Sequence, residues 1–181
     1  MSPIDPGAPN DSPGRVSFAD VVREHWVTVF RCVYHMTGNA DDAEELTQET
    51  FLRAMNGWAK FEAGTNTRAW VLRIARNAYT DLYRRKQKIR FVSLPDRPAF
   101  VAAAGPSPAE LADETARVRA ALAELSETTR LVFLMRVEGE LSFADVAAAL
   151  GTTEEAARWH MHQARTKLQK RLGAHDPADF A

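Results

Sequence analysis

Several features are scarce or missing from this 181-residue sequence. It has one cysteine, Cys32, so no intramolecular disulfide can form. No apolar run approaches the roughly 20 residues of a membrane span, and the Pro-, Gly- and Asp-rich start has no signal-peptide core. Gly-rich phosphate loops and nucleophile elbows are also missing. We therefore expect a cytoplasmic protein without membrane insertion, enzymatic activity, small-molecule substrate or cofactor.

The lone cysteine allows two interpretations. Cys32 and His35 lie one turn apart on an expected helix, and with His25 they could ligate a metal. No fourth ligand is evident, so a small buried hydrophobic residue is the favoured interpretation of Cys32. His160 and His162 are two residues apart and face different ways on a helix. No metal site is predicted from either group.

Charge is distributed unevenly along the chain, although its net value is only −1. Residues 1–60 carry 5 Lys and Arg against 9 Asp and Glu, whereas residues 61–90 carry 8 against 2. The balance is 5 against 8 in residues 91–141 and 5 against 5 in residues 142–181. The short basic block predicts contact with a polyanion, and the acidic segments suit a protein partner.

Apolar residues recur at helical spacing in both halves of the chain, and no strand pattern is convincing. Prolines at 95, 98, 106 and 108 interrupt the pattern. We predict an all-α protein of two small helical domains joined by a flexible linker, the C-terminal domain being a helix-turn-helix. The predicted parts are a disordered tail (1–15), a first domain (16–88), the linker (89–110), a second domain (111–175) and a tail (176–181).

The first domain is expected to contain helices over 18–36, 41–58 and 68–88. Gly38 is the expected stop of the first helix, and Asn39 or Asp41 the cap of the second. The second helix has a polar outer face and an apolar inner stripe. The inner stripe is Ala43, Leu46, Thr50, Phe51, Ala54, Met55 and Trp58.

The outer face of that second helix contains Asp42, Glu45, Gln48, Glu49 and Leu52. Ordinary helix solvation explains such a face. An exposed leucine among acids also suggests a partner surface. Composition alone favours solvation.

The third helix has a basic face. Arg73, Arg76, Asn77, Thr80 and Arg84 recur at spacings of three and four, with aromatic residues among them. Basic groups hold phosphates and aromatic rings can stack on unpaired bases, so we favour nucleic-acid binding for the arginines. A solvated face is the alternative, and for Trp70 a place in the core is favoured.

The helix-turn-helix pattern lies near the C-terminus. A short helix opens at Ser142 and closes at Gly151, and a longer one follows from a predicted capping box over Thr152–Glu155. Its outer face could enter a major groove, or the helix pair could be a packing or dimerisation unit. That face contains Glu155, Arg158, Trp159, His162, Arg165 and Gln169.

Three stretches in order resemble a known family, the extracytoplasmic-function group of RNA polymerase sigma factors. Residues 41–54 (DDAEELTQETFLRA) resemble its polymerase-binding region. Residues 64–77 (GTNTRAWVLRIARN) with 81–87 (DLYRRKQ) resemble its minus-ten region, which melts and reads the promoter. Residues 141–147 (LSFADVA) through 163–168 (QARTKL) resemble its minus-thirty-five helix-turn-helix.

The resemblance implies binding to core polymerase, through the β′ clamp helices and the β flap, and to promoter DNA. It also implies control by an anti-sigma factor and a linker that threads toward the active-site and RNA-exit channels. The implied polymerase-binding residues are Asp42, Glu45, Leu46, Thr47, Gln48, Glu49 and Leu52. We expect Leu46→Ala with Gln48→Ala to weaken core binding and leave the fold intact.

The implied DNA-binding residues form two groups, and the loop around 60–67 would capture a flipped base. The minus-ten group is Lys60, Phe61, Asn66, Thr67, Arg68, Trp70, Arg73, Arg76, Asn77, Thr80 and Arg84. The minus-thirty-five group, in a helix-turn-helix over 141–160 and just beyond it, is Ser142, Thr152, Thr153, Glu155, Arg158, Trp159, His162 and Arg165. The alternative function is a helix-turn-helix regulator that does not bind polymerase.

The recognition helix departs from the pattern common in this family. Glu155, Ala156, Ala157 and Trp159 stand where a Gly-Thr-Val-and-Ser pattern is frequent. A carboxylate at Glu155 would repel phosphate unless it caps the helix or accepts from a cytosine amine. Trp159 is bulky for a groove. We therefore expect an atypical promoter sequence.

Overall fold

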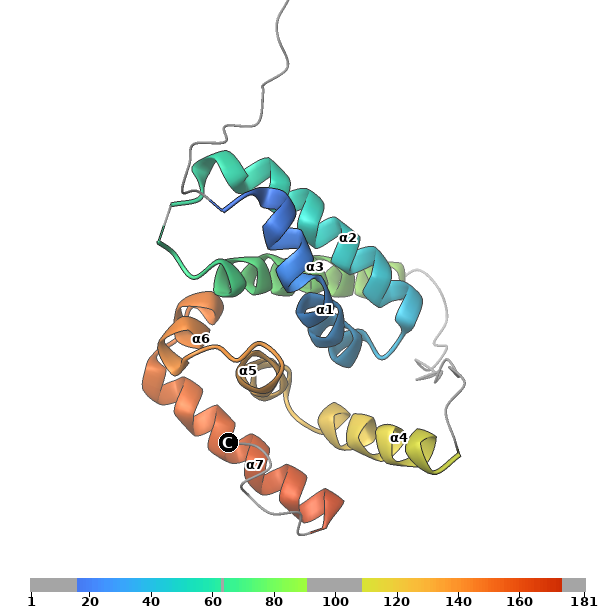
Figure 1. The fold of residues 1–181 in the computed structure, drawn as a ribbon. Helices are drawn as coiled ribbons and strands as arrows, with labels where there is room; N and C mark the ends of the chain where they lie inside the picture. Colours follow the sequence, from blue (N-terminus) through green and yellow to red (C-terminus); the bar gives the residue numbers. More distant parts are fainter. Residues whose placement is uncertain (1–15, 63, 91–108, 174–181) are drawn as a thin grey trace, which may run out of the picture.

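The computed structural model describes residues 16–62, 64–90 and 109–173, and in these residues the protein is all-helical (Figure 1). The first unit holds α1 (Phe18–Thr37), α2 (Ala40–Gly57), the 3-10 turn η1 (Trp58–Lys60) and α3 (Thr67–Arg90). The second holds α4 (Ala109–Ala123), α5 (Glu127–Val137), α6 (Phe143–Leu150) and α7 (Glu154–Leu172). The predicted fold class is confirmed. Within the described segments, no helix is long and apolar enough to span a bilayer.

Part of the sequence-based prediction lies outside the described residues. Both predicted tails and residues 91–108 of the predicted linker lie outside the described residues. At the two ends of the predicted linker, residues 89–90 continue α3 and residues 109–110 begin α4.

Short capping residues fix the ends of α1 and α2. Ser17 accepts a hydrogen bond from the Asp20 N–H, and Asn39 accepts from the Asp42 N–H. Between them Gly38 adopts φ 71°, a left-handed conformation that glycine adopts without strain. The predicted stop and cap are therefore confirmed, and they turn the chain so that α2 packs back against α1.

Helices α1, α2 and α3 bury a common apolar core. Val29, Val33, Leu46 and Val71 are at most 1% exposed. Trp26 stacks on Phe51 with ring centroids 5.3 Å apart. This packing fixes which faces of α2 and α3 remain outside.

The second unit is built around α5 and α7, with α4 and α6 packed on them. Ser126 caps α5, Ser142 caps α6 as predicted, and Gly151 ends α6 with φ 67°. Val132, Val146 and Ala157 are fully buried between these helices. The turn at Gly151 therefore sets α6 and α7 in the helix-turn-helix arrangement.

The two units pack against each other through α1 with α5 and α3 with α6. Figure 1 shows α6 beside the first half of α3 and α5 beside α1. The buried apolar residues of both units form one continuous cluster. Across the boundary, the Cys32 thiol lies 3.9 Å from the Leu134 carbonyl oxygen. The sequence did not indicate this direct packing of the units.

Gly139 marks a close approach between the units. A Cβ atom there would lie 2.7 Å from Leu72 Cδ1 and 2.6 Å from the Met135 carbonyl oxygen. We predict that Gly139→Ala lowers the free energy of unfolding by about 1–3 kcal/mol, because the backbone or Leu72 must move. At Gly57 an added Cβ meets only Trp70, at 3.4 Å, so Gly57→Ala should be neutral or stabilise by up to about 1 kcal/mol. Denaturant titration tests both, and equal effects would contradict the prediction.

Candidate nucleic-acid and protein interfaces

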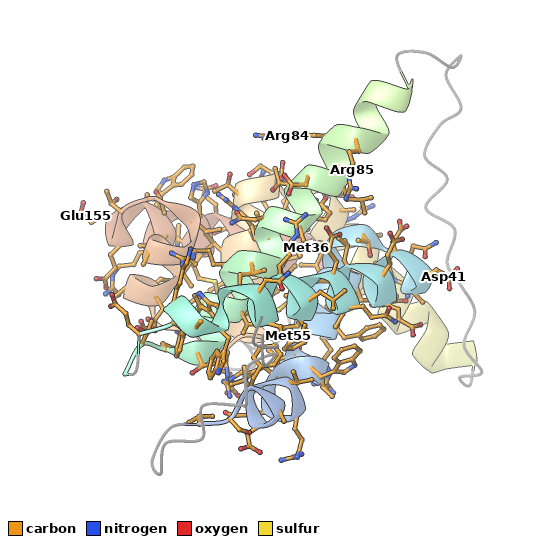
Figure 2. All side chains as sticks on the ribbon, turned by 90° about the horizontal axis from the view of Figure 1, so that it is seen from above. Met36, Asp41, Met55, Arg84, Arg85 and Glu155 are labelled. Carbon is orange, nitrogen blue, oxygen red and sulfur yellow. The ribbon has the colours of Figure 1, made fainter. Side chains whose placement is uncertain are left out.

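The outer face of α2 forms a stripe that we call the α2 stripe: Asp41, Glu45, Gln48, Leu52 and Met55. All five residues are exposed, at helical spacings of three and four. Leu52 and Met55 are 58% and 53% exposed, which is unusual for side chains of this size and polarity. Figure 2 shows Asp41 and Met55 toward opposite ends of α2. The stripe is acidic at its start and apolar at its end.

The burial of residues on α2 differs from what four predictions required. Met55 was predicted to lie inside and is exposed, so it is, with Asp41, one of two residues of this face that the sequence reasoning did not assign to it. Leu46 and Thr47 were predicted to contact a partner, but they are 1% and 0% exposed and pack inside the first unit. Thr47 also donates to the Ala43 carbonyl at 2.6 Å. The burial of Leu46 argues against the expectation that Leu46→Ala with Gln48→Ala leaves the fold intact, because the loss of the leucine side chain would leave a cavity.

Glu49 is occupied within the first unit. Its carboxylate pairs with Arg53 at 2.6 Å and lies 3.8 Å from Arg85. Arg53 also pairs with Asp81 on α3 at 2.8 Å. These carboxylates raise the pKa of Arg53, with the Asp81 hydrogen bond as the largest cause. Glu49 therefore ties α2 to α3.

Helix α3 carries the predicted basic face. Arg73, Asn77 and Arg84 are exposed, and Arg84 projects away from the fold in Figure 2. Within the described residues, neither Arg73 nor Arg84 forms an ion pair with a carboxylate. Thr80 differs, since its hydroxyl donates to the Arg76 carbonyl of its own helix at 2.9 Å. The two arginines thus offer uncompensated positive charge to solvent.

Three predicted minus-ten residues contact the second unit. Arg68 pairs with Glu140 at 2.6 Å, and the Asn66 amide donates to Asp145 at 3.0 Å. Arg76 donates to the Leu150 carbonyl oxygen at 3.4 Å. The Asn66 amide oxygen also accepts from the Ala69 N–H, so Asn66 caps α3 as well. In this arrangement α6 and the turns around it occupy part of the predicted DNA face.

The predicted aromatic residues of the loop belong to a cluster. Phe61 stacks on Trp58 with centroids 5.0 Å apart, and both rings contact Trp70. Trp70 is half-buried and packs against the apolar core. Trp70 thus packs on the core, the place that the sequence analysis favoured for it. The cluster holds Phe61, just after η1, against Trp70 near the start of α3, while Lys60 stays exposed.

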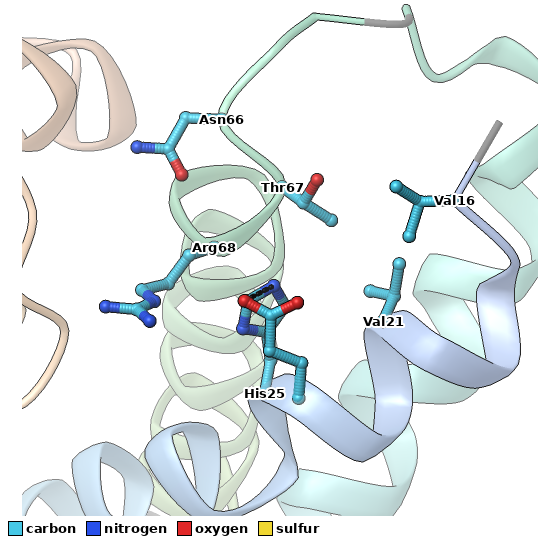
Figure 3. A pocket seen from close by; sticks show the side chains of 7 residues that line it. Val16, Val21, His25, Asn66, Thr67 and Arg68 are labelled. Atoms are coloured by element: carbon cyan, nitrogen blue, oxygen red, sulfur yellow. Dashed lines mark ion pairs between the residues drawn. The ribbon is translucent and has the colours of Figure 1, made fainter. Parts of the chain in front are cut away.

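A pocket of about 260 Å³ opens beside the start of α3 (Figure 3). His25, only 3% exposed, forms part of its wall, and its Nδ1 atom has no hydrogen-bond partner among the residues that the structure describes. Burial lowers the pKa of His25, nearby Arg68 lowers it further, and Glu24 opposes both. The ring is therefore mainly neutral at pH 7. The pocket is lined by Val16, Val21, Glu24 and His25 from the α1 side and by Asn66, Thr67 and Arg68.

The start of α7 differs from the predicted capping box by one residue. Thr153, not Thr152, is the N-cap, and its hydroxyl accepts from the Ala156 N–H at 3.1 Å. Glu155 is then one residue short of the reciprocal position of a capping box. It is exposed, and in Figure 2 it projects outward at the edge of the second unit. Helix capping therefore does not account for Glu155.

The outward face of α7 carries the predicted recognition residues. Glu155, Arg158, Trp159 and His162 are exposed, and Arg165 is half-buried. Arg158 forms an ion pair with Glu154, and its guanidinium lies over the Phe143 ring, 4.7 Å from the centroid. The opposite side of α7 is buried through Ala157, Met161, Ala164 and Leu168. Ser142 acts as the cap of α6 and hydrogen-bonds Asp145.

Two groups were weighed as metal ligands from the sequence: Cys32 with His25 and His35, and His160 with His162. Across the three described segments, no group of three or more His, Cys, Asp or Glu side chains is arranged to hold a metal ion. Cys32 is buried, and burial raises the pKa of its thiol well above the usual range. Burial also lowers the pKa of His35, which lies 3.8 Å from Glu138 of the second unit.

The described residues define a class by their fold, the all-helical proteins with a helix-turn-helix, a motif that many DNA-binding proteins share. Comparison with known families refines it: residues 21–89 match Sigma-70 region 2, and residues 115–168 match Sigma-70 region 4. The chain therefore belongs to the sigma-70 family of RNA polymerase sigma factors, in the extracytoplasmic-function (ECF) group. Members are noncatalytic factors of transcription initiation that act with core RNA polymerase at promoters.

Individual relatives agree with this assignment. The chain is 34% identical to the ECF sigma factor SigE of Mycolicibacterium smegmatis, over 93% of this chain and 66% of that protein. It is 31% identical to the sigma factor CarQ of Myxococcus xanthus, over 87% and 90% of the two chains. The alignment with SigE thus spans just under two thirds of that relative's length.

Solved structures share the fold. The sigma factor RpoE of Bartonella quintana, solved with the anti-sigma factor NepR, matches with a TM-score of 0.76 at 22% identity over 88% of this chain and 98% of that one. CnrH, solved with the cytosolic domain of CnrY, matches with a TM-score of 0.65 at 26% identity over 88% and 89%. Both likenesses extend across the two helical units.

Proposed function

We propose that this chain binds core RNA polymerase through the α2 stripe and directs transcription from promoters that α3 and α7 select. The observation that carries the proposal lies in the first unit. An exposed acidic and apolar stripe on α2 coexists there with two exposed arginines on α3, Arg73 and Arg84, that form no ion pair within the described residues. The two faces allow one rigid unit to hold a protein and a polyanion together. An anti-sigma factor is proposed as a further partner, since RpoE of Bartonella quintana was co-crystallised with the anti-sigma factor NepR and CnrH was solved with the cytosolic domain of CnrY.

Polymerase contact is proposed for the α2 stripe rather than for the whole predicted set. Glu45, Gln48 and Leu52 remain from the earlier prediction, and Met55 joins them because it is exposed beside Leu52. Asp42 is half-buried at the helix start and is kept as a flanking contact. Burying apolar side chains at the centre of a polar rim is the usual source of affinity in such interfaces.

Minus-ten DNA is proposed to lie along α3 and the Lys60–Thr67 loop. Arg73, Asn77 and Arg84 supply donors for phosphates, and Arg76 and Arg68 join them once they leave the second unit. The pocket beside the start of α3 supports the placement of an unpaired base there. Because flipping a base costs a few kcal/mol, contacts in the pocket must offset that cost.

Minus-thirty-five DNA is proposed to receive α7 in its major groove. The outward residues Arg158, Trp159 and His162 lie on one side of the helix, and the buried side holds it on α5 and α6. Ser142, Thr152 and Thr153, at the starts of α6 and α7, can reach phosphates near the groove. Arg165 extends the same face.

Transcription from a genomic library tests the proposed function against the alternative. We expect specific start sites only when the chain and core polymerase are both present. A helix-turn-helix regulator without polymerase contact would bind its DNA sites alone and would not create start sites on bare core enzyme. Failure to associate with core polymerase would overturn the proposal.

The basic face gives a second expected result. Arg73→Ala with Arg84→Ala should weaken holoenzyme–promoter binding roughly ten-fold or more and reduce the log–log salt slope by about 1.8, because each phosphate contact contributes about 0.9. Binding is measured at several salt concentrations. Exposed arginines on α1 and α4 provide the control: Arg31→Ala with Arg117→Ala should leave the slope unchanged. Equal slopes for both double variants would remove α3 from the DNA interface.

A further inference from the structure

Trp159 is an unusual residue on the outward face of α7. Its side chain is 57% exposed, although indole is among the largest apolar groups in proteins. The helix has a buried side available, which smaller residues such as Ala157 and Ala164 occupy. The sequence therefore leaves a large apolar ring in water on the face proposed to enter DNA.

The indole is held in place from below. Its ring meets His160 edge to face, with centroids 4.9 Å apart. His160 Nδ1 lies 3.0 Å from the hydroxyl oxygen of Thr129 on α5, and Thr129 accepts from Ser126 at 2.8 Å. Thr129 is only 5% exposed. A chain of contacts thus connects the exposed ring to the buried part of the second unit, which limits the entropy lost when the ring binds.

The neighbours of Trp159 supply the polar contacts of a groove-facing surface. Arg158, beside it, is oriented by Glu154 and Phe143. Glu155 and His162, one turn before and after, are exposed. The indole therefore lies at the centre of a patch that already has donors and an acceptor for base edges and phosphates.

Major-groove chemistry identifies the group that suits an apolar ring. Among the base edges in that groove, only thymine displays an apolar group, its C5 methyl; the others display donors and acceptors. We propose that Trp159 is a specificity-determining residue that contacts the C5 methyl of a thymine in the minus-thirty-five element. This inference rests on the proposed function and adds to it the base that this residue selects.

Replacement of thymine by uracil tests the inference directly, because uracil lacks only the methyl group. A minus-thirty-five duplex is first selected by holoenzyme from a randomised library, and each thymine is then replaced singly. We expect one replacement to weaken wild-type binding about four-fold, the effect of about 0.8 kcal/mol for one buried carbon. Trp159→Ala holoenzyme should bind the thymine duplex more weakly and show no further loss with uracil at that position.

A matched variant and two controls make the result specific. His162→Ala, on the same face, should keep the four-fold sensitivity to uracil. Thermal unfolding should show that Trp159→Ala stays folded, since the side chain is mostly exposed. Binding of that variant to core polymerase without DNA should be unchanged.

Three outcomes would overturn the inference: no thymine is sensitive, Trp159→Ala retains the sensitivity, or Trp159→Ala weakens core binding and so marks a protein contact. Failure of the proposed function looks different. In that case the holoenzyme selects no sequence from the library at all.

Discussion

The double variant Leu52→Ala, Met55→Ala will bind core RNA polymerase at least about 30-fold more weakly than the native chain. Both side chains are more than half exposed and lie at the apolar end of the α2 stripe. Anchors of this kind contribute about 2 kcal/mol or more when buried in a partner, and 2 kcal/mol corresponds to about 30-fold in affinity. Titration of labelled core enzyme measures the loss.

The folded state should survive this double change, because neither residue belongs to the core. Trp159→Ala, which removes a similarly exposed apolar side chain from the second unit, is the matched control and should leave core affinity unchanged. By contrast, Leu46→Ala should lower the free energy of unfolding by about 2–5 kcal/mol, because its side chain is fully buried. If the double variant retains native affinity, the stripe is not the docking face.

Cross-linking the two units in their packed arrangement will reduce promoter-specific transcription at least ten-fold. Elements centred 25 base pairs apart, as the names minus-ten and minus-thirty-five state, are separated by about 85 Å of duplex at 3.4 Å per pair. The described segments of the two packed units together have about 140 residues, and a compact fold of that size has a radius of gyration of only about 14 Å. The packed units are therefore too close together to read both elements, and they must separate on a promoter.

His35 and Glu138 offer a suitable cross-linking pair. They lie on different units, 3.8 Å apart, and outside the proposed interfaces. The variant His35→Cys, Glu138→Cys is joined with a short reducible bismaleimide, while buried Cys32 should not react. We expect at least a ten-fold loss of specific transcription after cross-linking and recovery after reduction, with each single variant as control. Full activity of the cross-linked chain would show that the units need not separate.

Local sequence signals predicted most of the fold. Asn39 and Ser142 are caps that the sequence indicated, whereas it did not indicate the Ser17 cap of α1, and Gly38 and Gly151 take the left-handed conformation that ends α1 and α6. Two adjacent threonines made the start of α7 ambiguous by one residue. Either hydroxyl can cap a helix, and in the structure Thr153 is the cap.

The candidate interfaces were less predictable at their borders. Helical periodicity placed Leu46 inside, as the structure does, whereas the family motif assigned it to a partner surface. Met55 lies near the boundary between the two faces of α2, where helical periodicity does not determine whether a side chain is buried or exposed. The contacts of Arg68 with Glu140 and of Asn66 with Asp145 join residues more than 70 positions apart. Local periodicity carries no signal for such pairs.

The close contact between Leu72 and the backbone at Gly139 has a consequence for binding strength. Separation of the two units would expose apolar surface that is now buried between them, and this exposure to water is unfavourable. An isolated molecule should accordingly spend only a small fraction of its time extended. The affinity for DNA that requires the extended form is reduced by that fraction. The free protein should therefore bind DNA weakly until core polymerase provides surfaces that replace the contacts between the units.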